Sequence, residues 1–270
     1  MSSITQLRRI ETGRGAHRRQ DSTASSLVGR MVFVALIVGV PAAGITAQET
    51  GVFYPNIPGE LLLENDYVVV QRYIIEPGKW EGIHSHPGNQ IAVRIKGGLW
   101  GGRRGGREVS RMTEPTKDGS VGWMDAIDIS EQHESGNVGD TPIDLVWVTL
   151  KACEPLSNHT VGLFYPNIPV ETLLENDRVV VQKFVAEPGE WEGVHSHAGN
   201  QVYVHIKGGT WAGRLGGREV YRQTEPSKDG SAGWLDAIDL SEGHNSGNVG
   251  DTMAELVYVT IKPCRPLATP

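Results

Sequence analysis

Apolar residues along most of this chain occur in short runs that are rich in β-branched and aromatic side chains. Runs of this kind cover residues 68–75, 91–96, 122–129 and 145–151. Pro-Gly, Gly-Gly, Asp-Gly and Gly-Asp pairs punctuate the sequence around them, and such pairs mark tight turns between strands. No long stretch has the clean 3.6-residue period of an amphipathic helix. The pattern predicts an all-β protein, and the many short strands favour closed barrels or sandwiches of the jelly-roll kind.

The whole pattern occurs twice. Residues 53–156 align without a gap to residues 164–267, and both copies contain the segments FYPNIP, HSH, IKGG, GGREV and SGNVGDT. A unit of roughly 100 residues has the usual size of an independent domain and is much longer than one solenoid repeat. We therefore predict two tandem domains, over residues 48–157 and 158–270.

The first 47 residues belong to a different class of sequence. Six arginines precede an apolar run over residues 31–40, and mostly small residues follow it as far as Ala47. This order is typical of a signal peptide. We interpret residues 1–47 as a leader that is cleaved near Ala47, which predicts export to the periplasm or secretion without stable membrane insertion. An uncleaved anchor is the alternative, but a bilayer span needs about 20 apolar residues and Pro41 ends this run early.

Charge and cysteine content narrow the choice of partners. The chain has a formal charge of −7, and removal of six basic and two acidic residues with the leader changes it to −11. This acidic balance argues against nucleic acid as a partner.

Cys153 and Cys264 occupy equivalent positions in the two copies. They can pair in an oxidising compartment, but duplication alone also explains their equivalence, so a disulfide and two free thiols both stay open.

Histidines gather at three equivalent positions in each copy. Six of the nine histidines of the chain lie there, and a glutamine follows the second histidine at a fixed spacing. Residues two apart on a strand share a face, so each HSH pair points to one side, where it can hold a divalent metal. A single set would more simply be core or surface histidines, but two complete sets favour metal binding. The predicted ligands are His84, His86, Gln90 and His133, and His195, His197, Gln201 and His244.

The residues around these positions resemble the two motifs of the cupin superfamily. The first motif is matched by Gly78, His84, His86 and Gly97, with Gln90 where most cupins have glutamate. The second is matched by Gly122, His133 and Asn137, with Asp128 and Ser130 in place of the usual proline and glycine. The second copy matches through Gly189, His195, His197, Gln201, Gly208, Gly233, His244 and Asn248. The resemblance implies a bicupin, that is, two tandem jelly-roll β-barrels that each bind one metal inside, and it makes a homodimer possible through the valine-rich strands near Val68 and Val179.

The predicted ligand set has a chemical consequence. Three histidines and one glutamine are neutral, so a bound divalent ion would keep its full charge and suit Lewis-acid work on a carbonyl, hydroxy acid or carboxylate. The cupins that this set resembles include hydroxynitrile lyases and uronate-processing enzymes. The expected cofactor is a divalent metal, two per chain, with Mn, Zn, Ni, Fe and Cu all compatible.

Residues that differ between the copies are candidates for substrate contact. Every second residue of a strand faces the same side of the sheet. Counting in twos from each glutamine therefore places Arg94 inside the first barrel, and Tyr203 and His205 inside the second. We predict that Arg94 pairs with a substrate carboxylate and that the other two act as proton donor or acceptor. Strand bends that turn these side chains outward are the alternative.

The same parity makes predictions for other repeated residues. It places Glu81 and Glu192 outward, which argues against a role as general bases. Trp80 and Trp191 have the inward parity of the HSH pairs, and they either wall the pocket entrance or are plain core aromatics.

Three function classes follow. The first is a metal-dependent lyase or isomerase acting on a small carboxylated or hydroxylated substrate. The second is a metal-dependent dioxygenase, which would consume oxygen. The third is an exported binding protein without catalysis, which intact ligand sets in both copies disfavour but do not exclude. One fold hosts many chemistries, so the barrel alone does not choose among them.

Overall fold

The protein is described here by a computed structural model, which covers residues 51–156 and 162–266. The expected leader, residues 1–47, lies outside this range, so its cleavage and the export of the protein stay predictions. No helix among the described residues is long and apolar enough to cross a bilayer.

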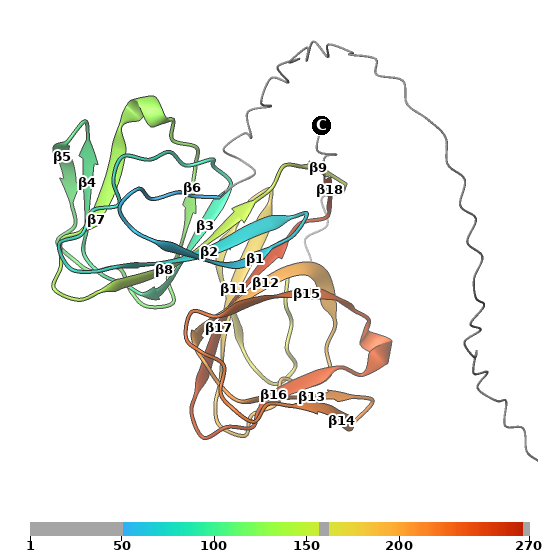
Figure 1. Ribbon diagram of the computed structural model, residues 1–270. Helices are drawn as coiled ribbons and strands as arrows, with labels where there is room; N and C mark the ends of the chain where they lie inside the picture. The colour runs from blue at the N-terminus through green and yellow to red at the C-terminus, as the bar shows by residue number, and fades with distance from the viewer. Residues whose placement is uncertain (1–50, 157–161, 267–270) are drawn as a thin grey trace, which may run out of the picture. The chain divides into compact units, whose positions relative to one another are not determined.

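The first copy folds into two antiparallel sheets that form a jelly-roll barrel (Figure 1). The larger sheet has the order β1-β2-β8-β3-β6, and the smaller has the order β5-β4-β7. The strands are β1 (Gly59–Glu64), β2 (Val68–Ile75), β3 (Gln90–Lys96), β4 (Trp100–Arg104), β5 (Arg107–Arg111), β6 (Val121–Met124), β7 (His133–Asn137) and β8 (Ile143–Leu150), and a short 3-10 helix, η2 (Ile129–Glu131), precedes β7.

The second copy repeats this arrangement. Its sheets have the orders β10-β11-β17-β12-β15 and β14-β13-β16. The strands are β10 (Val170–Glu175), β11 (Val179–Ala186), β12 (His197–Lys207), β13 (Trp211–Leu215), β14 (Arg218–Arg222), β15 (Ala232–Ile238), β16 (Asn245–Asn248) and β17 (Ala254–Ile261), and η3 (Leu240–Glu242) precedes β16. The prediction of an all-β chain with two tandem jelly-roll barrels is confirmed.

The central strands of the larger sheets are buried on both faces. Along β8, Leu145 and Trp147 point into the first barrel, while Val146 and Val148 join a cluster that also contains residues of the second barrel, such as Val259. Side chains alternate across a strand, so one set fills the barrel and the other packs between the barrels. Burial of both faces explains why these strands read as continuous apolar runs.

The valine-rich strands that were candidates for a dimer face are therefore occupied within the chain. Val68 and Val179, each fully buried, belong to this same shared cluster. Strand β3 contacts β12, β1 contacts β15, and the ring of Tyr67 stacks on that of Trp234 with centroids 5.6 Å apart. A homodimer, if one forms, has to use another surface.

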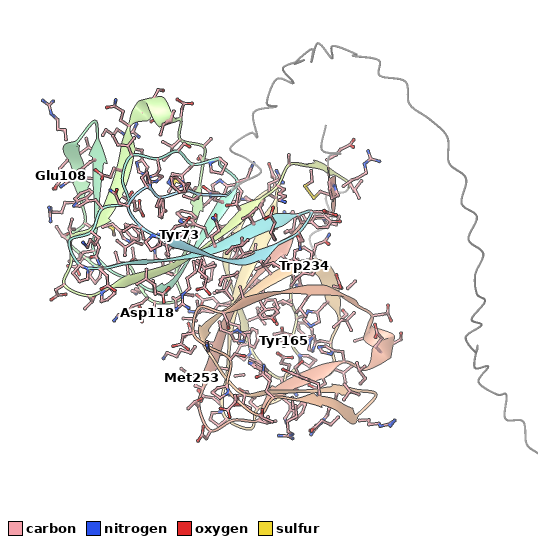
Figure 2. The ribbon with its side chains drawn as sticks, in the orientation of Figure 1. Tyr73, Glu108, Asp118, Tyr165, Trp234 and Met253 are labelled. Carbon is pink, nitrogen blue, oxygen red and sulfur yellow. A yellow bond between two sulfur atoms is a disulfide. The ribbon has the colours of Figure 1, made fainter. Side chains whose placement is uncertain are left out.

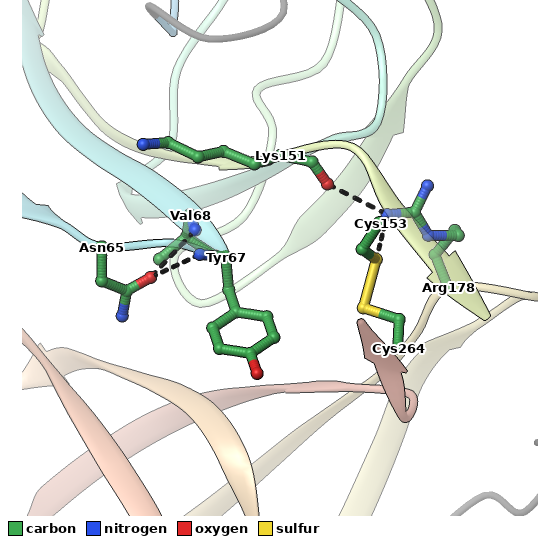
Figure 3. The surroundings of a disulfide bond; sticks show 7 residues. All are labelled: Asn65, Tyr67, Val68, Lys151, Cys153, Arg178 and Cys264. Atoms are coloured by element: carbon green, nitrogen blue, oxygen red, sulfur yellow. Dashed lines mark hydrogen bonds between the residues drawn. A yellow bond between two sulfur atoms is a disulfide. The ribbon is translucent and has the colours of Figure 1, made fainter. Parts of the chain in front are cut away.

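A covalent link also joins the two copies (Figure 3). Strands β9 (Cys153–Pro155) and β18 (Cys264–Pro266) pair antiparallel, and a disulfide connects Cys153 to Cys264. The guanidinium of Arg178 lies beside it and donates to the backbone oxygen of Lys151 at 3.3 Å. The structure thus contains the disulfide, which is one of the two states that the sequence left open.

Candidate metal centres

Each barrel interior brings its three predicted histidines together. His84 and His86 lie just before β3, and backbone bridges pair them with His133 and Ile127 across the barrel. The potential ligand atoms of the three histidines all lie within 4.8 Å of one another. His195, His197 and His244 form the same cluster in the second barrel.

Hydrogen bonds from Nδ1 assign the tautomers of the first two histidines. The Nδ1 atom of His84 lies 2.8 Å from the backbone oxygen of Gly82, and that of His86 lies 2.9 Å from the side-chain oxygen of Gln90. The backbone oxygen of Gly82 only accepts, and the Gln90 amide is oriented with its oxygen toward His86 and its nitrogen toward Thr149. In this arrangement each Nδ1 carries the proton and each Nε2 presents a lone pair. The two Nε2 atoms nevertheless lie 3.0 Å apart.

Two lone pairs at this separation repel each other unless a cation lies between them. The second barrel repeats the arrangement, with 2.9 Å between the Nε2 atoms of His195 and His197 and their Nδ1 atoms bonded to Gly193 and Gln201. Burial lowers the pKa of each of these histidines to about 4. They are therefore neutral at pH 7, the state in which imidazole binds metal.

The two glutamines lie behind the histidines. The side-chain oxygen of Gln90 accepts from His86, and its amide nitrogen donates to the hydroxyl of Thr149 at 2.8 Å. Register places Gln90 directly opposite Thr149 in the sheet, and Gln201 makes the same bond to Thr260. In this arrangement the glutamine holds the tautomer and orientation of a histidine, whereas the sequence predicted a direct ligand.

Glu81 and Glu192 lie inside the barrels, which the parity argument did not predict. Each is almost fully buried, and one carboxylate oxygen lies 3.7 Å from the Nε2 atom of His84 or His195. Burial raises the pKa of both carboxyl groups to about 8. The expectation that they face outward is wrong because Gly82 and Gly193 have positive φ angles of 83° and 84°, which interrupt the alternation before the histidines.

The signal for this inward turn was present in the sequence. A glycine follows the glutamate in both copies, as WEG, and a positive φ is a conformation that glycine adopts without strain. The tryptophan that precedes each glutamate does not point into the cavity. Trp80 packs against Gly136, and the Cζ atom of Arg103 lies over its ring, 3.4 Å from the ring centroid. Trp80 and Trp191 do not line the cavities described next.

The histidine cluster of the first barrel opens onto a cavity of about 350 Å³. Its lining includes Glu81, His86, His133 and the guanidinium of Arg94, with Ala92 at the position that continues the inward parity from Gln90. The predicted inward orientation of Arg94 is therefore seen in the structure.

The second barrel has a cavity of about 180 Å³. Tyr203 and His205 line it together with Glu192, as the parity predicted. The hydroxyl of Ser231 lies 3.1 Å from Nδ1 of His205, and burial lowers the pKa of this histidine to about 4. The two cavities thus differ in size and in the side chains beside the clustered histidines.

Sequence comparison gives no relative for the chain: no family model matches it, and no curated protein matches it. Solved structures are similar in fold. A cupin 2 conserved barrel domain protein from Leptotrichia buccalis is 11% identical, covering 77% of this chain and 90% of its own, with a TM-score of 0.45.

Two further structures illustrate the likeness. An oxalate decarboxylase variant from Bacillus subtilis is 12% identical over 80% of this chain and 76% of its own, with a TM-score of 0.49. A cupin domain from Bordetella pertussis Tohama I is 26% identical over 38% of this chain and 100% of its own, with a TM-score of 0.30. The duplicated motif residues, the two jelly-roll barrels and the histidine cluster inside each agree with the resemblance to two tandem cupin domains that the sequence indicated.

Proposed function

We propose that this chain is an exported metalloenzyme that holds one divalent metal in each barrel and acts as a lyase or isomerase on a small carboxylated or hydroxylated molecule. The observation that carries the metal assignment is the pair of Nε2 lone pairs 3.0 Å apart in one barrel and 2.9 Å apart in the other. A third histidine completes each cluster.

The donor set suits a divalent transition metal. Three neutral imidazoles are typical of Zn, Ni, Fe and Cu sites, and the nearby carboxylate of Glu81 or Glu192 adds one negative charge when it ionises. When bound, such a metal supplies Lewis-acid chemistry, because it stabilises negative charge on a substrate oxygen. The remaining steps depend on side chains of the cavity.

The second barrel carries groups that can move a proton. Tyr203, His205 and Glu192 line the same cavity as His197 and His244. Lyase and isomerase reactions remove a proton at one substrate atom and often return it at another, so they need an acceptor and a donor close to the stabilised oxygen. The carboxyl group of Glu192 and the phenol of Tyr203 are the pair that we assign to these tasks.

Metal analysis tests the first half of the proposal. Protein reloaded with Mn, Zn, Ni, Fe or Cu is expected to contain about two equivalents per chain of the best-fitting metal, and His86→Ala and His197→Ala are each expected to lose about one. The double variant should hold none. Failure of the wild-type protein to bind any of these metals would refute the proposal and favour an exported binding protein.

Turnover without oxygen tests the second half. Small hydroxy acids, hydroxynitriles and uronates are incubated with the loaded protein under nitrogen, and conversion is followed by NMR. Conversion that is unchanged in air supports a lyase or isomerase. Conversion that needs one molecule of O₂ per substrate, with iron or copper bound, would instead identify a dioxygenase.

Export is tested on the protein recovered from its own cells. Fractionation is expected to place it in the periplasm or the medium, and sequencing of its N-terminus is expected to begin near Gln48. A full-length cytoplasmic protein that begins at Met1 would contradict export, without bearing on the metal sites.

A further inference from the structure

The two cavities are built from duplicated sequence but differ in charge. Beside the shared histidines, the inward positions of β3 carry Ala92 and Arg94, whereas the equivalent positions of β12 carry Tyr203 and His205. The difference gives the first cavity a fixed positive charge that the second lacks.

Arg94 is a mostly buried cation without a counter-ion. Among the described residues, no carboxylate lies within 4.0 Å of its guanidinium, since none of the salt bridges involves it. Its Nε atom is buried and has no hydrogen-bond partner. Burial also lowers the pKa of Arg94. A buried charge without a partner is costly to the fold, so its retention in a cavity wall indicates a partner that comes from outside.

Two positions that differ between the copies create the space around Arg94: Ala92 and Arg94 stand where the second copy has Tyr203 and His205. A Cβ atom placed on Gly122 would lie 3.5 Å from both terminal guanidinium nitrogens, so the guanidinium lies over this glycine. In the second barrel the tyrosine hydroxyl covers the equivalent glycine: a Cβ on Gly233 would lie only 2.2 Å from the oxygen of Tyr203. Ala92 leaves this place free in the first barrel, and the arginine takes it.

The second cavity has neutral groups at the corresponding places. His205 is uncharged at pH 7 because burial lowers its pKa to about 4, and Ser231 is bonded to its Nδ1. Tyr221 and Gln223 take the places of Ser110 and Met112 in the cavity lining. This cavity is also smaller, about 180 Å³ against about 350 Å³.

We infer that the cavity of the first barrel is a binding site for a small carboxylate, held through the guanidinium of Arg94 next to the histidine cluster, and that the cavity of the second barrel takes an uncharged, hydroxylated molecule. Guanidinium and carboxylate match in charge and in the geometry of two parallel hydrogen bonds. The inference deepens the proposed function and rests on it, because it gives the two metal centres different substrate classes.

The test compares a dicarboxylate with its uncharged diamide. Malonate and malonamide are titrated by calorimetry into full-length protein whose metal content has been measured beforehand. The wild-type protein is expected to bind one malonate per chain tightly and to bind malonamide much more weakly at this site. Arg94→Gln is expected to weaken malonate binding about 10- to 100-fold, the usual effect of losing hydrogen bonds to a charged group, and to leave malonamide binding unchanged.

Two further variants sharpen the test. Arg222→Gln removes an exposed arginine of the other barrel that pairs with Glu219, and it serves as the matched control for lost charge. The double variant Tyr203→Ala/His205→Arg rebuilds the Arg94 arrangement in the second barrel and is expected to gain a second tight malonate site. A gain of binding does not arise from partial unfolding, so this arm stays informative even if Arg94→Gln folds poorly.

The outcomes separate this inference from the proposed function. Equal affinity for malonate and malonamide, or full malonate affinity in Arg94→Gln, would overturn the carboxylate site while two bound metals leave the metalloenzyme standing. Absence of metal would overturn the proposed function, and malonate binding by the metal-free protein would then still report on Arg94. Thermal unfolding adds a check, since Arg94→Gln is expected to unfold at the wild-type temperature or above it if Arg94 serves a ligand and not the fold.

Discussion

At the scale of single residues, each histidine cluster depends on side chains that lie behind it. Gln90 and Gln201 hold the Nδ1 proton of a histidine, and this proton directs the Nε2 lone pair into the cluster. Partners of this kind around metal sites are typically important for affinity, since they fix both the tautomer and the ring orientation.

Gln201→Leu should therefore weaken metal binding in the second barrel alone. The leucine fills the space but leaves the Nδ1 of His197 without an acceptor, so a 10- to 100-fold loss of zinc affinity is expected at that site. Competition with a fluorescent chelator measures both sites in one titration, and the first barrel is the internal control. Unchanged affinity at the second site would show that the hydrogen bond seen here is unimportant.

The buried histidines also predict how the metal-free protein responds to pH. Burial lowers the pKa of five of them from 6.5 to about 4, and these are His84, His86, His195, His197 and His205. Below pH 6.5 the unfolded chain takes up protons that the folded chain does not, so stability falls as the pH drops from 6.5 to 4.

The two buried glutamates act in the opposite direction. Their pKa rises from 4.5 to about 8, so the folded chain keeps protons that the unfolded chain loses, and stability falls as the pH rises from 4.5 to 8. Five histidines outweigh two glutamates at acid pH. We expect the melting temperature of the metal-free protein to peak between pH 6 and 7; a flat profile from pH 4 to 7 would contradict the burial of these groups.

At the scale of elements, the strand pair β9–β18 holds the two copies together through the Cys153–Cys264 bond. The bond links residues 111 positions apart, and it excludes many extended conformations of the unfolded chain.

Removal of this bond should lower stability without changing the metal sites. Cys153→Ser/Cys264→Ser is expected to reduce the free energy of unfolding by about 3–5 kcal/mol, the value for a loop of this length. Urea unfolding followed by tryptophan fluorescence measures the change, and metal content provides the control. Equal stability of the oxidised wild-type protein and this double variant would show that the bond does not form or does not constrain the chain.

Strand periodicity predicted much of the interior correctly. Alternation from Gln90 placed Arg94 in the cavity, and the same count from Gln201 placed Tyr203 and His205, because β3 and β12 run without interruption through these positions. The count failed at Glu81, where a glycine with positive φ intervenes. The hydrogen bonds between His86 and Gln90 and between His197 and Gln201 were not foreseen, since a spacing of ligands does not say which side of a histidine a neighbour contacts, and direct ligation by the two glutamines stays a prediction.

Other polar residues have a local role that their sequence context did not reveal. Asp128 and Asp239, which stand in the second motif and its copy, cap the 3-10 helices by accepting from the backbone N–H of Ser130 and Ser241. Their carboxylates lie at the exposed surface, outside the two cavities. A side chain that caps a turn and one that serves in catalysis can have the same identity, and only the backbone path separates them.

At the scale of the whole molecule, the duplication is part of the folding unit. Each barrel presents an apolar face to the other, formed in the first copy by side chains such as Val70, Val93 and Val148 and in the second by Val181 and Val259. These residues are fully buried in the chain, where the two faces pack in one cluster. The sequence revealed the two copies, but it did not reveal that they share a core, because a strand buried on its second face by a neighbouring domain has the same composition as one buried by a partner subunit.

A single copy expressed alone should therefore self-associate. Residues 48–157 would expose the valine-rich face of β2, β3 and β8, and the pairing of two identical copies can bury it much as the second barrel does. Light scattering after gel filtration is expected to find a dimer or larger species, and Val93→Asp, which places a charge in this face, should return the fragment to a monomer. The full-length protein is the control, since the face is already covered there. A wild-type fragment that stays monomeric at high concentration would show that the barrels fold and remain soluble independently, and the shared cluster would then be a consequence of linkage and not a requirement of the fold.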